Sequence, residues 1–216
     1  NDTSDLDENT KSLNAILKLP NDSFKEKLLT TGIVATINQS KSTQEIIDVF
    51  DTYKVGLTDA KNINYLNAKV QDAIRLGKNA KAPNFEAFDL NGNIVRLQDF
   101  KGKFVVIDVW ATWCGPCKYV SPSFEKAANQ YAKNENIVFI AISVDKNKIA
   151  WISQAKNKPK TVKQLIATNI DTFGNEYSIE SIPRFILIDK EGNFVNSKMP
   201  MANESAFDIV LENTLK

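Results

Sequence analysis

FVVIDVWATWCGPCKYVSP, residues 104–122, joins a long apolar run to the only two cysteines of the 216-residue chain. KFVVIDVW (103–110) is continuous and rich in β-branched residues, which predicts a buried strand at the centre of a sheet. Residues 117–132 then carry apolar side chains on one helical face. Cys114 therefore lies where a strand ends and a helix begins, and Cys117 lies one turn into that helix.

This junction favours redox chemistry at the two cysteines. The first N–H groups of a helix are unpaired and carry a partial positive charge, which stabilises a thiolate over a thiol. Cysteines in that position titrate at about 3.5 to 7.5 instead of about 8.5. We expect the sulfur of Cys114 to be exposed and nucleophilic and that of Cys117 to be held behind it. Such a pair can attack a disulfide and then release the mixed disulfide.

The two residues between the cysteines suit the same geometry. Gly115 is expected to allow the close approach of another backbone. Pro116 is compatible with a first helical turn, because no N–H is missed there. Both residues are therefore predicted to contact a substrate chain.

A structural disulfide and a zinc site both fit the cysteine pair less well. A structural disulfide normally links distant segments, and a loop this short restricts the unfolded chain very little. A zinc site needs about four ligands, whereas the chain offers two cysteines and no histidine. The absence of histidine also excludes Ser/His/Asp and Cys/His catalysis. No metal and no organic cofactor is expected.

The charge balance excludes a large basic surface. The chain has 27 basic and 26 acidic residues and a net charge of +1, which leaves no field to hold nucleic acid or an anionic membrane. The longest apolar run, IVFIAISV (137–144), is too short to span a bilayer. The chain starts at Asn1 and not at Met, which fits a processed product. A solvated, poorly ordered acidic tail is expected at Asp2, Asp5, Asp7 and Glu8.

The chain divides into two regions of different periodicity. Residues 1–80 carry apolar residues at helical spacing in several segments and are predicted to form an all-helical N-terminal domain of unknown role. GKNAKAP (77–83) has the composition of a linker. Residues 81–216 alternate buried strands with helices and close with a hairpin and a helix. This order predicts a mixed α/β sheet covered on both faces.

Two segments resemble thioredoxins. FVVIDVWATWCGPCKYVSP (104–122) is similar to the thioredoxin active-site segment, and SIPRFILIDKEGNF (181–194) looks like the cis-proline strand and hairpin of that family. The lead-in at 82–103 and the extra helix and strand within 148–168 resemble periplasmic thiol-disulfide oxidoreductases of the TlpA/ResA type. The resemblance covers 81–216 and implies a thioredoxin-like catalytic domain, a mixed sheet flanked by helices.

Asp108 lies within the apolar strand that precedes the cysteines. A carboxylate there is costly to bury unless it is protonated or has a function. In thioredoxins the aspartate at the matching position moves the proton of the inner cysteine, so the resemblance implies that Asp108 is the acid/base for Cys117. The alternative is a carboxylate that points outward. The lysine that thioredoxins often place near this aspartate is replaced by an apolar residue near Ala141, which implies a higher pKa for Asp108.

The resemblance also implies a substrate groove. Pro183 is expected to be cis and to leave the backbone of Ile182 free to pair with an extended substrate. The alternative is a trans proline at a strand edge. Trp113 is expected to cover the exposed sulfur and Trp110 to pack in the core, and core packing alone is the alternative for either residue. Arg184, directly after Pro183, is expected to be a solvated side chain, and the alternative is a contact with the substrate.

These residues predict an enzyme, a thiol-disulfide oxidoreductase that reduces protein disulfides outside the cytoplasm. The resemblance implies a periplasmic or similar location and a membrane electron donor of the DsbD/CcdA kind. A lipid anchor could lie upstream of this chain, and no membrane span is expected within it. The alternative is a partner-binding module, in which the helical region recognises a target and the thioredoxin-like domain is a scaffold or redox clasp. The WCGPC pair disfavours a peroxidase.

Overall fold

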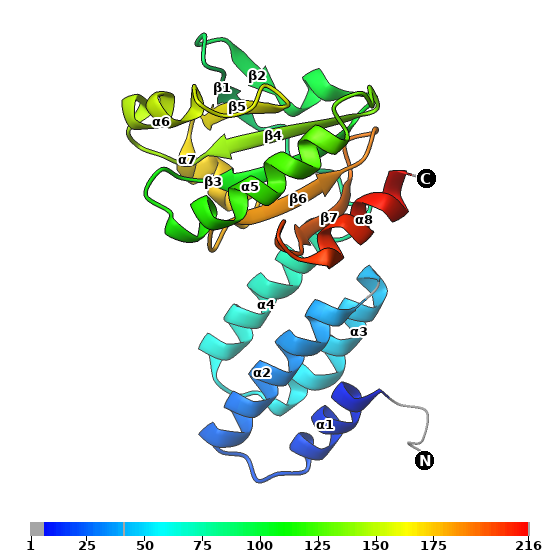
Figure 1. The fold of residues 1–216 in the computed structure, drawn as a ribbon. Coiled ribbons are helices and arrows are strands. Elements are labelled where there is room, and N and C mark those ends of the chain that lie inside the picture. The colour runs from blue at the N-terminus through cyan, green and yellow to red at the C-terminus, as the bar shows by residue number, and fades with distance from the viewer. Residues whose placement is uncertain (1–6, 41, 216) are drawn as a thin grey trace. The chain divides into compact units, whose positions relative to one another are not determined.

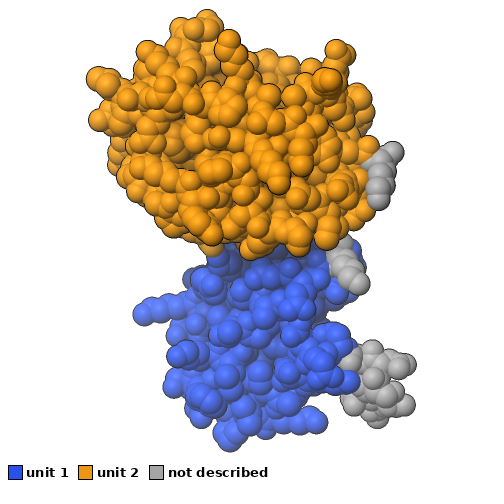
Figure 2. All heavy atoms as spheres, in the orientation of Figure 1, with its two compact units in different colours: residues 1–77 blue, residues 78–216 orange. Residues whose placement is uncertain are grey.

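The computed structural model describes residues 7–40 and 42–215 of the chain. The chain divides into two compact units, Asn1–Gly77 and Lys78–Lys216, each in its own colour in Figure 2. Among the described residues, the first unit is helical and the second holds all the strands (Figure 1). Each unit has a hydrophobic core of its own.

The helices of the first unit begin at capping side chains. The carboxylates of Asp7, Asp22 and Asp59 and the hydroxyl of Ser42 accept backbone N–H groups of the first turn, which a helix start leaves unpaired. The elements are α1 (Glu8–Leu17), α2 (Ser23–Gln39), α3 (Thr43–Tyr53), the short 3₁₀ helix η1 (Lys54–Gly56) and α4 (Ala60–Arg75).

The poor order expected of the acidic tail is wrong at its last two positions, Asp7 and Glu8, although both residues are exposed. The carboxylate of Asp7 accepts backbone N–H groups at 2.9 and 3.1 Å, and Glu8 is the first residue of α1. Both carboxylates lie at the positive end of a helix dipole, which favours negative charge. Asp2 and Asp5 lie outside the described residues.

A carboxylate on α2 ties this helix to the start of α4. Glu26 accepts hydrogen bonds from the hydroxyl and the backbone N–H of Thr58, from the backbone N–H of Asp59 at 3.1 Å and from Nδ2 of Asn62 at 2.9 Å. The Thr58 hydroxyl and then the Asn62 amide have the largest effect, and together these donors lower the pKa of Glu26 from 4.5 to about 2. The ionised carboxylate therefore fastens the two helices together.

The second unit is a seven-stranded mixed sheet with the strand order β2-β1-β5-β4-β3-β6-β7. The central strands β3, β4 and β5 run parallel, and the outer strands pair antiparallel. This is the mixed sheet that the sequence predicts. The strands are β1 (Glu86–Phe88), β2 (Ile94–Arg96), β3 (Phe104–Trp110), β4 (Ile137–Ser143), β5 (Val162–Ala167), β6 (Arg184–Ile188) and β7 (Phe194–Met199), with the 3₁₀ helix η2 (Leu97–Phe100) after β2.

Helices cover both faces of the sheet (Figure 1). α5 (Gly115–Gln130), α6 (Lys148–Ala155) and α8 (Ser205–Leu215) bury side chains in one core cluster with β3. The crossovers β3–α5–β4 and β4–α6–β5 advance in one direction with the usual right-handed sense, which puts α5 and α6 on the same face. α7 (Ile170–Glu176) covers the opposite face, where the rings of Phe173 and Phe85 lie 6.4 Å apart.

β3 is buried along both faces, as its sequence predicts. Val105, Val106, Ile107 and Val109 are each at most 1% exposed. The strand ends at Trp110, and α5 begins five residues later at Gly115.

Across the part of the chain that the structure describes, none of the helices combines the length and the apolarity that a membrane crossing requires.

Glu26→Gln is expected to loosen the contact between α2 and α4. The pKa of Glu26 in the folded protein lies below its ordinary 4.5, so the carboxylate's contribution is complete above about pH 4.5 and is lost as the pH falls toward about 2. Native-state hydrogen exchange of the α2 and α4 amides measures this contribution. Wild-type protection should fall over that acid range, and the variant should exchange faster at neutral pH with a weaker acid dependence.

Glu8→Gln, at the exposed start of α1, is the matched control and should leave the protection of α2 and α4 unchanged. Equal protection of these helices in Glu26→Gln and the wild type at neutral pH would contradict the role given to Glu26.

Candidate active site

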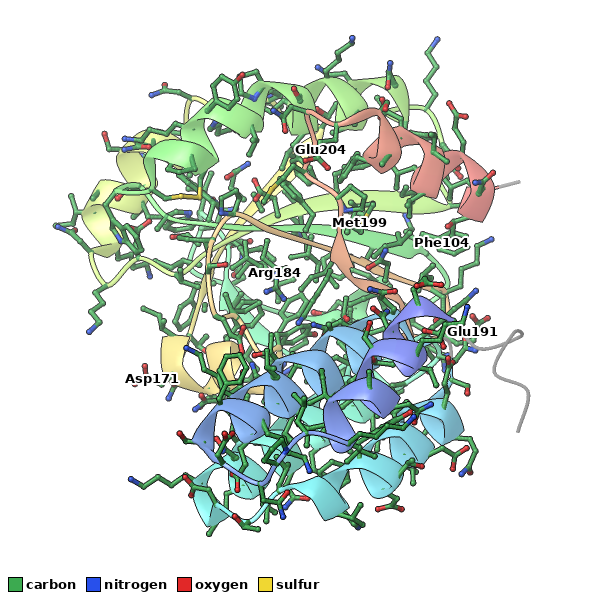
Figure 3. The ribbon with its side chains drawn as sticks, turned by 90° about the horizontal axis from the view of Figure 1, so that it is seen from below. Phe104, Asp171, Arg184, Glu191, Met199 and Glu204 are labelled. Carbon is green, nitrogen blue, oxygen red and sulfur yellow. A yellow bond between two sulfur atoms is a disulfide. The ribbon has the colours of Figure 1, made fainter. Side chains whose placement is uncertain are left out.

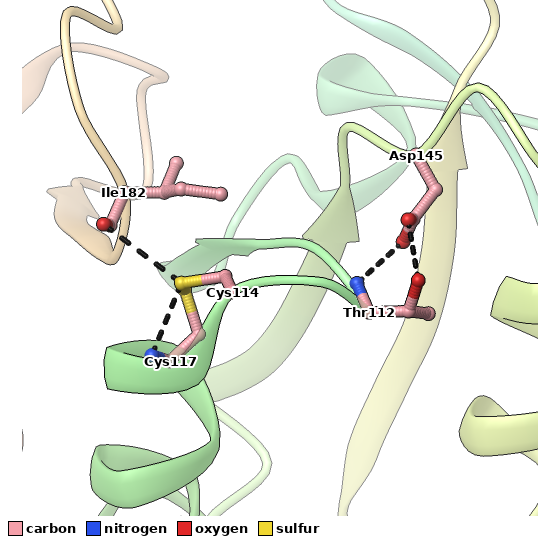
Figure 4. The surroundings of a disulfide bond; sticks show 5 residues. All are labelled: Thr112, Cys114, Cys117, Asp145 and Ile182. Atoms are coloured by element: carbon pink, nitrogen blue, oxygen red, sulfur yellow. Dashed lines mark hydrogen bonds between the residues drawn. A yellow bond between two sulfur atoms is a disulfide. The ribbon is translucent and has the colours of Figure 1, made fainter.

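A disulfide closes the start of α5. Cys114 and Cys117 are joined, with Cα atoms 5.3 Å apart (Figure 4). Cys114 is the N-cap of the helix, and the backbone N–H of Cys117 donates to the Cys114 sulfur at 3.1 Å. A helix N–H aimed at a sulfur stabilises the negative charge of a thiolate there. The cap therefore favours Cys114 as a nucleophile once the pair is reduced.

Both cysteines are buried in this oxidised state. Cys114 is 4% exposed and Cys117 is 1% exposed, so the expected exposure of the Cys114 sulfur is wrong for the oxidised protein. Part of the cover comes from the segment before Pro183, because the carbonyl oxygen of Ile182 lies 3.9 Å from the Cys114 sulfur (Figure 4). Access to this sulfur depends on that segment.

The peptide bond between Ile182 and Pro183 is cis, as the thioredoxin resemblance implies, and the trans alternative is wrong. Ile182 is partly buried and packs against the core cluster that contains both cysteines. The loop before β6 is thus held against the start of α5, although the two segments are 68 residues apart in sequence.

Gly115 and Pro116 form the exposed first turn of α5. Pro116 occupies the early helical position predicted for it. A Cβ placed on Gly115 meets no atom within 4 Å, because the residue lies at the exposed end of the helix. The close approach of a substrate backbone to Gly115 stays a prediction. The space beside Gly115 is open.

The two tryptophans that flank the motif lie in different environments. Trp110 is 5% exposed and belongs to the core cluster, as predicted. Trp113 is 69% exposed, directly before Cys114 in the chain. Its role as a cover for the sulfur stays a prediction.

Asp108 faces the interior of the catalytic unit. The residue is 4% exposed, so the alternative of an outward-pointing carboxylate is wrong. Alternation along β3 places Asp108 on the same face as Trp110, which shares the core cluster with Cys117. Its partners in the neighbouring strands are Ala141 and Phe185, both apolar.

Burial controls the charge state of Asp108. Loss of solvent raises the pKa of Asp108 from 3.8 to about 7, while Lys158 acts to lower it and Glu125 to raise it. The Oδ1 atom of Asp108 has no hydrogen-bond partner among the described residues. A carboxyl group with a pKa near neutrality can take up and return a proton at physiological pH.

A second buried carboxylate, that of Asp145, fixes the loop before Cys114. Asp145 is 3% exposed. Its two oxygens accept the backbone N–H of Thr112 at 2.8 Å and the Thr112 hydroxyl at 2.6 Å (Figure 4). They also accept the Ser143 hydroxyl at 2.7 Å. Asp145 was not predicted from the sequence. Its position two residues after the end of the buried strand β4, beside the end of β3, was the available signal, because parallel neighbours end at the same sheet edge.

Arg184 departs from its expected solvated state. The side chain, labelled in Figure 3, starts from the first residue of β6 and is partly buried. Its Nη1 atom is buried and has no hydrogen-bond partner among the described residues. Burial lowers the pKa of Arg184, and Glu180 acts in the opposite direction.

The described residues form no group of three or more His, Cys, Asp or Glu side chains that could hold a metal ion.

A Cys-X-X-Cys disulfide at the start of a helix, held against a cis-proline loop on a mixed sheet, defines a thiol-disulfide protein of the thioredoxin fold. Residues 77–211 match the Redoxin family model, and the chain belongs to this family, in its TlpA/ResA-type branch. Because these relatives are thiol-disulfide oxidoreductases, the chain is identified as a thiol-disulfide oxidoreductase as well.

A sequence relative and two solved structures show the extent of the likeness. Thiol-disulfide oxidoreductase ResA of Bacillus thuringiensis subsp. konkukian is 34% identical over 128 residues, which are 58% of this chain and 70% of the relative. The thioredoxin domain of a thiol-disulfide oxidoreductase from Bacteroides vulgatus is 27% identical, with a TM-score of 0.58, and covers 65% of this chain and 99% of its own.

The third comparison reaches into the helical unit. The crystal structure of a thioredoxin-like protein from Bacteroides caccae covers 94% of this chain and 81% of its own, with a TM-score of 0.65. At 14% identity it shows a shared fold alone.

Asp145→Asn is expected to weaken the fold and slow the reaction of Cys114. The amide places an N–H₂ group among donors, and a buried group left unsatisfied costs about 1–3 kcal/mol. Thermal unfolding should show a lower Tm, and the reduced variant should react more slowly with a small disulfide because Thr112 is no longer fixed.

Asp189→Asn is the matched control for Asp145→Asn. Asp189 accepts the backbone N–H groups of Glu191 at 3.0 Å and Asn193 at 2.7 Å in the β6–β7 turn. It should lower the Tm without slowing Cys114. Equal slowing in both variants would remove the positioning role of Asp145.

Asp108→Asn is expected to stabilise the oxidised protein at neutral and alkaline pH. The folded pKa of Asp108 is raised, so its protonated form is favoured and stability is lost as the pH rises from 3.8 through about 7. A difference of that size corresponds to on the order of 4 kcal/mol. Urea unfolding across this range should show falling wild-type stability and a flatter profile for the variant. A variant that is less stable than the wild type at alkaline pH contradicts the buried carboxylate.

Proposed function

We propose that this oxidoreductase reduces protein disulfides outside the cytoplasm through the Cys114–Cys117 pair. The observation that carries the proposal is the Cys117 N–H donated to the Cys114 sulfur at 3.1 Å, at the start of α5. This donor favours a thiolate on Cys114 and supports it as the attacking sulfur. Cys117, at 1% exposure, is then the resolving sulfur.

The reaction begins with the reduced pair. The Cys114 thiolate attacks one sulfur of the substrate disulfide, which forms a Cys114–substrate disulfide and breaks the substrate's own S–S bond. The other substrate sulfur leaves as a thiolate and takes a proton from solvent. The substrate chain is now bound covalently to Cys114.

Resolution returns the second substrate sulfur. The Asp108 carboxylate takes the thiol proton of Cys117, and the Cys117 thiolate attacks the Cys114 sulfur. The Cys114–Cys117 disulfide forms, and the expelled substrate thiolate receives the proton from Asp108. Two electrons and two protons have then passed to the substrate, and the product is the oxidised pair of the structure.

The substrate chain is proposed to dock along the cis-proline loop. An extended segment pairs with the backbone of Ile182 beside Pro183, which lies next to Cys114. The open space at Gly115 and the exposed surfaces of Pro116 and Trp113 support a chain that passes over the disulfide.

The direction and place of the reaction rest on the family resemblance. Pro116 between the cysteines matches the thioredoxin motif, which favours a reducing pair. The TlpA/ResA likeness supports a periplasmic or other extracytoplasmic location, a lipid anchor upstream of this chain and regeneration by a membrane electron donor of the DsbD/CcdA kind.

A partner-binding module is the second candidate, and the helical domain is what favours it. This domain, residues 1–80 in the division proposed from sequence, has a core separate from that of the catalytic domain at 81–216. In this second function the helices recognise a target and the redox domain is a scaffold or clasp.

The reduction potential tests the direction of electron flow. The protein is equilibrated in defined thiol/disulfide buffers, alkylated and analysed by mass spectrometry for the Cys114–Cys117 disulfide. A potential close to that of thioredoxin, about −270 mV, is expected, and a value toward that of DsbA, about −120 mV, would reverse the direction.

Two cysteine variants test the order of attack. Cys117→Ser should accumulate a mixed disulfide between Cys114 and a substrate protein, whereas Cys114→Ser should form none. If instead Cys114→Ser forms a mixed disulfide through Cys117, the proposed roles of the two cysteines are reversed. Wild-type turnover of disulfide substrates no faster than that of Cys114→Ser indicates the binding module.

A further inference from the structure

We propose that Lys158, held on α5 by Ser121 and Glu125, is the cation that lets buried Asp108 ionise and thereby sets the pH range in which Cys117 resolves the mixed disulfide. The inference rests on the acid/base role proposed for Asp108. It makes Lys158 and Glu125 positioning residues that act through Asp108 without contact with the reacting sulfurs.

The side chain of Lys158 is fixed at a definite point on α5. Lys158 follows α6, and its Nζ donates to Ser121 Oγ and to Glu125 Oε1, both at 2.7 Å. Ser121 Oγ also donates to Glu125 Oε1 at 2.9 Å. The side chains of Lys158 and Glu125 are only 26% and 21% exposed, so this ion pair is shielded from solvent better than an ordinary surface pair.

The cluster lies on the side of α5 that turns toward β3. Cys117, Ser121 and Glu125 are spaced by four residues and therefore share one side of the helix. Cys117 packs in the core cluster from that side. Lys158 Nζ lies 6.0 Å from the centre of the Trp110 ring, and Trp110 lies two residues after Asp108 on the same strand face.

The surroundings of Asp108 leave Lys158 as its main electrostatic support. The neighbouring strands contribute apolar Ala141 and Phe185, and α8 contributes apolar side chains to the same cluster. α5 contributes the Cys117 sulfur and the Glu125 carboxylate. No donor reaches Asp108 Oδ1 among the described residues. A charge in such a poorly solvated place is stabilised by a nearby cation, and Lys158 is the cation that acts to lower the pKa of Asp108.

Glu125 limits the effect of this cation. The two residues act on Asp108 in opposite directions, Lys158 toward the carboxylate and Glu125 toward the protonated acid. Replacing one or the other with a neutral residue should therefore shift the titration of Asp108 in opposite directions. A merely structural ion pair would give no such opposition, because loss of either partner would have the same effect on packing.

The test is the pH dependence of resolution in Lys158→Met, Glu125→Gln and the control Lys160→Met, an exposed lysine two residues further along. Fully reduced protein is mixed with dithiobis(nitrobenzoate) in a stopped-flow instrument. The first release of coloured thiolate reports attack by Cys114 and scales with the reagent concentration. The second release reports resolution by Cys117 and does not. The leaving thiolate needs no proton, so the second rate follows the proton acceptor alone.

Opposite shifts of the pH midpoint are expected for the second release. Lys158→Met should raise the midpoint and slow resolution about fivefold at neutral pH, the loss that a rise of about one unit in the pKa of Asp108 produces. Glu125→Gln should lower the midpoint, and Lys160→Met should match the wild type. The first release should keep its wild-type rate in all of them. Unchanged midpoints in Lys158→Met and Glu125→Gln, or shifts in the same direction, overturn the inference.

Asp108→Asn separates this inference from the function on which it rests. If Asp108→Asn abolishes the pH dependence of the second release and Lys158→Met leaves its pH midpoint unchanged, the inference fails and the role of Asp108 stands. If the second release of Asp108→Asn keeps the wild-type pH dependence, the acid/base role of Asp108 itself fails. The Asp108 carboxyl resonance in ¹³C-labelled oxidised protein gives the same midpoints at equilibrium. Should Lys158→Met not fold, Glu125→Gln decides, and a midpoint that does not fall overturns the inference.

Discussion

The burial of β3 on both faces is the constraint from which the rest of the catalytic unit follows. A strand with apolar side chains on both faces needs paired strands on either side and helices above and below. Those requirements bring β4 and β6 beside it and α5 over one face. They also remove water from Asp108, the one carboxylate on the strand, and lead the chain directly from its end into the cysteine pair.

Two groups a few residues apart then differ in how well their surroundings stabilise a negative charge. At the start of α5 the backbone offers an N–H to the Cys114 sulfur, which stabilises an anion there. Behind it, burial disfavours the anion on Asp108 and raises the pKa of this group to about 7. A nucleophile that is readily ionised and an acid that holds its proton near neutrality are what the two halves of disulfide exchange require.

The features that could be predicted from the sequence are those that depend on residues close together in the chain. Apolar periodicity identified the buried strand and the helices, and WCGPC with the later Ile-Pro located both halves of the disulfide site. Burial of Asp108 followed from its place in an apolar run. Features that depend on tertiary contact were missed or wrong. The exposure of Cys114 was wrong because a loop 68 residues away lies over it, and Lys158 sits in a lysine-rich turn with nothing local to mark it.

In the proposed mechanism, stability and catalysis depend on the same carboxylate, that of Asp108, and its cation is only partly available for a reason. A lysine bonded directly to Asp108 would hold the carboxylate ionised and leave no acid to return a proton. A site with no cation would hold the acid protonated and leave no base. Lys158 Nζ donates hydrogen bonds to Glu125 and Ser121 at 2.7 Å each. The negative charge of Glu125 therefore opposes the effect of Lys158 on the pKa of Asp108. The protonated and ionised forms then differ little in free energy near pH 7, so the carboxyl group can both take up and release a proton there.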